Sequence, residues 1–155
     1  MSTNDEKQSI ESIVQLVFDG RESEALSAIS LELGNSTIKA LRFSATDVDR
    51  PGAKRDGEDE GRRDRVRLTN LYKLSVFLMD NKLWDKAVTA LRWTIKLSED
   101  MEETYFLEDS RFRKALCHKM LGQRNEMLKE TEMISAVDDE TFFIGDKVLG
   151  VRDLD

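Results

Sequence analysis

Residues 80–87 read DNKLWDKA, and the same plan occurs at residues 18–25, FDGRESEA, and at residues 120–127, MLGQRNEM. In each stretch a helix-like segment leads into a short polar turn. A second helix-like segment then opens close to a small or slender side chain, namely Ala25, Ala87 or Met127. Two helices joined by so short a connection run antiparallel and pack against each other. The sequence therefore predicts stacked antiparallel helical hairpins and an all-α fold.

The apolar residues that flank these turns recur with the period of an α-helix. Ile10, Ile13, Val14 and Val17 follow the i, i+3, i+4, i+7 spacing of one helix face. Similar patterns predict helices from Ala25 to Leu33, from Arg62 to Met79, from Trp84 to Leu97 and from Tyr105 to Leu121, with a shorter helix after Gly122. The helix over 62–79 is apolar on most sides, so we expect it to be buried between neighbours.

Two segments depart from the helical pattern. Residues 44–61 mix acidic and basic side chains with one proline and several glycines, a composition that predicts a flexible charged loop, either disordered or functional. Residues 142–149, FFIGDKVL, predict a short C-terminal β-hairpin that turns at Gly145 and Asp146. An isolated hairpin is marginal in water, so this one should dock on the body of the protein or on a partner.

The whole-chain properties indicate one helical domain spanning residues 1–155. The net charge of −7 disfavours nucleic acid as a partner and suits a basic protein, although moderate negative charge also simply maintains solubility. The chain has one cysteine, Cys117, no apolar leader at its N-terminus and no apolar run long enough to span a membrane. We therefore expect a cytoplasmic protein without a membrane partner.

The hairpins resemble tetratricopeptide repeats, in which small residues allow two helices to cross closely. The middle unit fits best, with Ser75 and Ala87 as its small residues, whereas Met127 replaces the alanine in the last unit. The spacing is irregular, because Ala25 and Ala87 are 62 residues apart and Ala87 and Met127 are 40 apart, against about 34 in the family. The resemblance covers about two-thirds of the chain and implies an irregular stack of hairpins.

In that family the first helices of the repeats line a concave groove that holds a protein segment. Carried over by position, the resemblance brings Tyr72, Val76, Met79, Phe112 and Lys119 towards such a groove. The alternative is that these side chains belong to the core, which is the usual place of Val and Phe. Tyrosine suits an interface because its ring buries a large area while its hydroxyl stays hydrogen-bonded.

Trp93 raises a separate question about the surface. At 100° per residue it points away from Trp84, so it cannot share the apolar stripe that Trp84 begins. Either another helix covers Trp93 or it is exposed. An exposed Trp93 beside Leu97 would offer a partner-binding or homodimer patch.

The sequence contains no motif typical of catalysis or of cofactor binding. Cys117 and His118 are adjacent on a predicted helix, so their side chains point about 100° apart and do not form a nucleophile–base pair. The acidic clusters at residues 102–109 and 138–140 match no metal-binding loop and are explained by helix capping. The arginines at 62–67 follow acidic residues that can neutralise them. We expect no cofactor and no bound metal.

These observations favour a non-enzymatic module that binds one protein partner through a helical-hairpin surface. An immunity-type inhibitor and a dedicated chaperone are two subclasses that suit a small acidic protein of this kind. The first alternative is a homo-oligomeric structural scaffold. The second is an enzyme or a small-ligand-binding bundle whose site residues are too dispersed along the chain to recognise.

Overall fold

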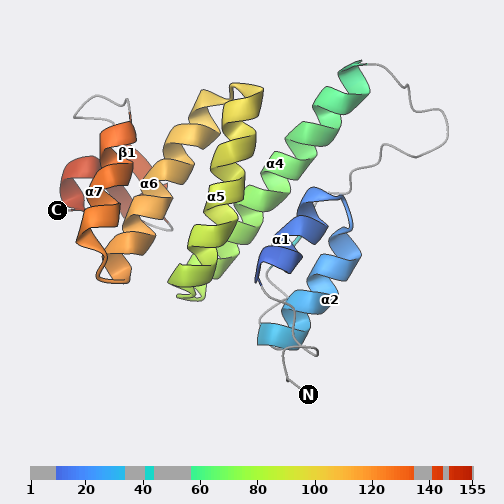
Figure 1. Cartoon of the computed structure of the whole chain (residues 1–155), viewed down its shortest axis with the longest axis horizontal. Coiled ribbons are helices and arrows are strands. Elements are labelled where there is room, and N and C mark those ends of the chain that lie inside the picture. The colour runs from blue at the N-terminus through green and yellow to red at the C-terminus, as the bar shows by residue number, and fades with distance from the viewer. Residues whose placement is uncertain (1–9, 34–40, 44–56, 135–140, 145–146, 155) are drawn as a thin grey trace. The chain divides into compact units, whose positions relative to one another are not determined.

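The computed structural model describes residues 10–33, 41–43, 57–134, 141–144 and 147–154 of the 155-residue chain. This part contains six α-helices, so the predicted all-α fold is confirmed (Figure 1). They are α1 (Ile10–Phe18), α2 (Glu22–Leu33), α4 (Gly57–Asp80), α5 (Trp84–Met101), α6 (Thr104–Met120) and α7 (Arg124–Met133). The chain divides into two compact units, Met1–Leu74 and Ser75–Asp155. Helix α4 runs through the boundary, and the single-domain organisation stays a prediction.

The first unit contains the hairpin of α1 and α2. Ile13, Val14 and Val17 of α1 are buried, as the helical spacing predicts. Ala25, Ala28 and Ile29 are their buried counterparts on α2. The N-terminal part of α4 belongs to the same unit and contributes buried Leu68, Leu71 and Leu74. The guanidinium group of Arg67 lies over the Phe18 ring, 4.9 Å from its centroid, and links α4 to α1 through a cation–π contact.

Four connections between consecutive helices share one backbone geometry. One residue in each turn has a positive φ angle: Gly20 (78°), Lys82 (60°), Glu102 (57°) and Gly122 (74°). The N–H of the next residue donates to the carbonyl five positions back, and its own carbonyl accepts the N–H four positions ahead. The first of these bonds closes the preceding helix in a Schellman arrangement, while the second belongs to the first turn of the following helix. The three predicted turns are confirmed, and the turn at Glu102 is a fourth that the sequence pattern did not reveal.

The second unit stacks its helices through these turns. The end of α4 contacts α5 where the hydroxyl oxygens of Ser75 and Thr94 lie 3.4 Å apart, both side chains being fully buried. Ala87 is also fully buried, so the small residues expected at this crossing are in the interior. Helix α5 packs on α6, and α6 packs on α7. Lys82, Glu102 and Gly122 follow one another at intervals of twenty residues, so α5 and α6 are elements of nearly equal length.

A C-terminal β-hairpin covers one face of the α6–α7 pair. Strands β1 (Thr141–Ile144) and β2 (Lys147–Gly150) are antiparallel, with Phe142 opposite Leu149, and the predicted hairpin is confirmed. The Phe142 ring stacks on the ring of Phe112 with centroids 4.5 Å apart. Their cluster is completed by the buried residues Ala115, Met127, Ile134 and Leu154. The hairpin therefore docks on the body of the protein, as its marginal stability in isolation requires.

The structure corrects two details of the sequence interpretation. Helix α4 begins at Gly57, so residues 57–61 are helical although they were predicted to belong to the loop over 44–61. The order of charges in the sequence gives the reason, since acidic residues precede arginines and this order suits a helix N-terminus. The rest of that predicted loop, residues 44–56, lies outside the described residues. In α5, Leu97 is buried and Trp93 is half-buried, so the two do not form the exposed patch considered above.

Candidate functional site

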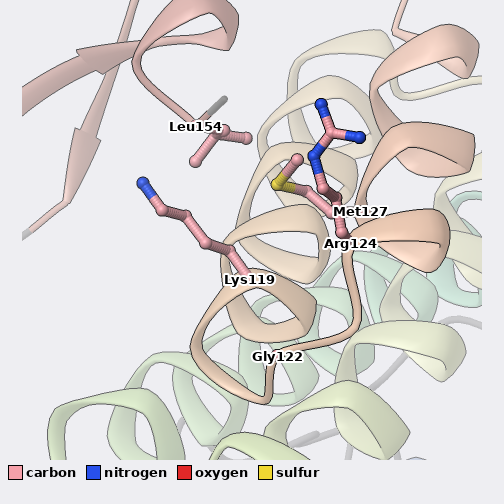
Figure 2. A pocket seen from close by; sticks show the side chains of 5 residues that line it. All are labelled: Lys119, Gly122, Arg124, Met127 and Leu154. Carbon is pink, nitrogen blue, oxygen red and sulfur yellow. The ribbon is translucent and has the colours of Figure 1, made fainter.

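A pocket of about 250 Å³ lies at the turn between α6 and α7. Its wall includes Lys119 near the end of α6, Gly122 in the turn, and Arg124 and Met127 on α7 (Figure 2). The remaining lining residue is Leu154, which follows the short 3₁₀-helix η2 (Val151–Asp153). Residues from α6, from α7 and from the end of η2, which follows the two β-strands, therefore converge on one depression in the surface of the second unit.

The turn at Gly122 fixes the mouth of this pocket. A Cβ atom built at Gly122 would meet no other atom within 4 Å, so the glycine is needed for its positive φ angle and not for space. The same turn exposes two neighbouring apolar side chains, Met120 at 52% and Leu121 at 37%. Exposed apolar residues scattered singly are normal, whereas extended exposed apolar patches mark contact surfaces.

The chemistry of the pocket combines two cations with an apolar floor. Figure 2 shows the side chains of Lys119 and Arg124 on either side of Met127 and Leu154. The Nζ atom of Lys119 donates to the backbone carbonyl of Asp153 at 3.3 Å, which uses one of its three N–H donors. The Asp153 carboxylate accepts the Gly150 N–H at 2.6 Å and so fixes the start of η2 to the end of β2. Met127 and Leu154 are buried, so the floor belongs to the core beneath the β-hairpin.

The cations in the middle of α6 have different surroundings. Arg113 donates to Asp109 at 2.7 Å, with the side chains 7% and 5% exposed. Arg111 donates to Glu99 of α5 at 2.9 Å, and Lys114 donates to Glu130 of α7 at 2.6 Å. These pairs link neighbouring helices or satisfy buried charges, which is the ordinary structural use of such groups. No carboxylate within ion-pair distance of Lys119 is found among the residues that the structure describes.

Cys117 and His118 lie just before the pocket and do not form a reactive pair. Burial raises the pKa of the Cys117 thiol to about 12, an effect that the nearby positive charge of Arg113 only partly opposes. The thiol is therefore protonated near neutral pH, whereas a nucleophilic cysteine requires the thiolate. The Nδ1 atom of His118 lies 2.7 Å from the Gln123 Oε1 atom, so the ring braces the α6–α7 turn.

The residues predicted to bind a partner differ in how far they are exposed. Phe112 is fully buried in the cluster beneath the β-hairpin, and Met79 is 4% exposed, so neither presents a surface. Val76, Tyr72 and Trp93 are half-buried, and Tyr72 belongs to the first unit. Lys119 is exposed and lines the pocket. The other lining residues, Gly122, Arg124, Met127 and Leu154, were not predicted as site residues.

Other kinds of site find no support in the part of the chain that is described. No group of three side chains there has the composition and proximity of a metal site. Among the same residues, no helix is both long enough and apolar enough to cross a membrane. No family model, curated protein or solved structure matches the chain. The resemblance to tetratricopeptide repeats consequently stays a prediction from the residues themselves.

Proposed function

We propose that this protein is a non-enzymatic binding module that holds one protein partner at the α6–α7 end of its helical stack. The observation that carries the proposal is the pair of exposed apolar side chains, Met120 and Leu121, beside a pocket with two cations. Burying such an apolar pair on association is favourable at roughly 25 cal/mol per Å² of apolar surface. Apolar contact with nearby charges supplies both the affinity and the orientation that a specific interface needs.

The architecture supports the same proposal. Schellman turns at twenty-residue intervals hold α4, α5, α6 and α7 in sequence, and repeated helical hairpins of this kind serve as binding surfaces in tetratricopeptide-like proteins. The β-hairpin closes one face of α6 and α7 and leaves their connecting turn exposed. More specifically, we propose that the protein acts in the cytoplasm. Its role there would be that of an immunity-type inhibitor or a dedicated chaperone.

The test is affinity capture from the native cell with matched surface variants. Met120→Ser together with Leu121→Ser removes the apolar pair, while Leu31→Ser alters a side chain that is 66% exposed in the first unit. We expect one dominant protein to be captured by the wild type and by Leu31→Ser, and to be lost with the double variant. Equal capture by all three would contradict the proposed surface. Capture of the chain itself, with a dimer in light scattering, would favour the homo-oligomeric scaffold instead.

A further inference from the structure

The pocket between α6 and α7 has a composition that specifies the chemistry of its occupant. We infer that it receives a segment of the partner in which an acidic residue stands next to an apolar one, an inference that rests on the proposed function. Lys119 supplies the positive charge for the acidic group, and Met127 and Leu154 form the apolar floor of the pocket, whose lining also includes Arg124 (Figure 2). An ammonium or guanidinium group forms its strongest hydrogen bonds with a carboxylate.

The local charge distinguishes this pocket from the rest of the protein. The chain carries a net charge of −7, so an acidic ligand is repelled by most of the surface. At 0.1 M ionic strength that repulsion is screened beyond about 10 Å, whereas the ammonium group of Lys119 acts at contact distance and keeps N–H donors for a ligand. An acidic group of the partner segment therefore has a reason to bind at Lys119, whereas a basic group would be repelled there.

The size and setting of the pocket favour a peptide segment over a free small molecule. A volume of about 250 Å³ lies below the ≈ 300–1,000 Å³ that is usual for sites that enclose a small ligand. A few side chains fit such a space. Met120 and Leu121 do not line the pocket but follow Lys119 directly in the chain and are exposed, so they remain for contact with the rest of the partner.

The contacts of Lys119 show which of its donors remain for a ligand. Leu154 forms part of the wall, and the backbone carbonyl of the preceding Asp153 accepts a hydrogen bond from Lys119, while the Asp153 carboxylate accepts the Gly150 N–H instead. Lys119 makes this bond through one N–H, so further donors remain for a ligand carboxylate.

The experiment measures fluorescence anisotropy of a labelled peptide in which aspartate and leucine alternate, titrated with the full-length protein. One comparison peptide carries asparagine for aspartate, and a second carries serine for leucine. Lys119→Glu is the test variant and Lys119→Arg the conservative one. Lys129→Glu is the matched control, because it makes the same change of charge on a 71% exposed side chain of α7 outside the pocket lining.

We expect the alternating peptide to bind and each comparison peptide to bind at least about tenfold more weakly. Lys119→Glu should raise the dissociation constant by about tenfold or more, while Lys119→Arg and Lys129→Glu leave it nearly unchanged. Failure of the alternating peptide to bind would overturn the inference. So would equal binding of the asparagine peptide, or equal losses with Lys119→Glu and Lys129→Glu.

The capture experiment separates failure of this inference from failure of the proposed function. If capture of a protein requires Met120 and Leu121 but not Lys119, the result supports the protein-binding function. The same result contradicts the inference that the pocket binds an acidic segment. Peptide binding that depends on Lys119, with no protein captured by the wild type, supports the ligand chemistry and contradicts the role in holding a protein.

Discussion

The middle of α6 and its C-terminal end both carry positive charges, but in different surroundings. In the middle, Arg111, Arg113 and Lys114 each donate to a carboxylate from the same helix or from a neighbour. At the end, Lys119 donates to a backbone carbonyl and faces a pocket with an apolar floor. One helix therefore separates two tasks, because the paired cations in its middle hold the stack together, whereas the exposed Lys119 at its end keeps donors for a ligand.

The largest expected effect comes from breaking the buried pair. Asp109→Ala leaves the Arg113 guanidinium buried without this carboxylate, and such a change costs about 3–5 kcal/mol of unfolding free energy. Urea denaturation followed by circular dichroism measures the loss. As a control, Asp109→Leu combined with Arg113→Met replaces both charges with apolar groups and should recover most of it. A loss below about 1 kcal/mol for Asp109→Ala would mean that the pair contributes no more than a surface ion pair.

Cys117 lies between the two stretches and provides a test by pH. Its pKa is about 12 in the folded protein against 9.0 as the ordinary value, so above pH 9 the unfolded chain loses a proton that the folded chain keeps. Stability then falls as pH rises, by up to about 1.4 kcal/mol per pH unit between the two pKa values. Relative to Cys117→Ala, the wild type should lose about 1.4 kcal/mol between pH 7 and pH 10. Parallel pH profiles would show that the thiol ionises equally in both states.

Substitutions in the turns at the two ends of α6 should change the free energy of unfolding by smaller amounts and in opposite directions. Glu102 and Gly122 both have positive φ angles, a conformation that costs a residue with a Cβ atom about 1 kcal/mol. We expect Glu102→Gly to stabilise the protein and Gly122→Ala to destabilise it, each by about 1 kcal/mol in thermal or urea unfolding. If both substitutions destabilise the protein, the contacts of the Glu102 side chain must stabilise the turn by more than the positive φ angle costs.

The smallest effect on stability is expected for the pocket cation. Lys119→Glu places a negative charge in the last turn of α6, which costs no more than about 1 kcal/mol through the helix dipole. The same substitution should strongly weaken peptide binding, as argued above. A stability loss as large as that of Asp109→Ala would show that Lys119 stabilises the fold as Arg113 does. The middle and the end of α6 would then not differ in the role of their cations.

The helical hairpins could be predicted because their signals are local. Gly20 and Gly122 mark two turns directly, and apolar spacing defines α1, α5 and α6 to within a few residues. The turn at Glu102 was missed because a residue other than glycine adopts the positive φ angle there, which leaves no mark in the sequence. The start of α4 was placed too late because glycines at 57 and 61 indicate a loop, although the segment is helical.

The site was harder to predict because it depends on contacts between distant residues. Lys119 was identified by position within the hairpin, but Leu154 reaches the pocket only because the β-hairpin folds back on α6 and α7. The folding back of the β-hairpin also explains why Phe112 is buried. Phe112 was expected to face a groove, and it stacks instead on Phe142 of the hairpin. Arg124 is an exposed charge on a helix, and nothing in its local sequence distinguishes it from the other surface cations.

Amide hydrogen exchange by mass spectrometry, on the protein alone and in complex with the partner that it captures, tests whether the α6–α7 end binds that partner. Binding at the α6–α7 end predicts slower exchange in peptides that cover residues 119–127, with little change in α1 and α2. Slower exchange confined to other helices, with 119–127 unchanged, would contradict the account and place the partner elsewhere.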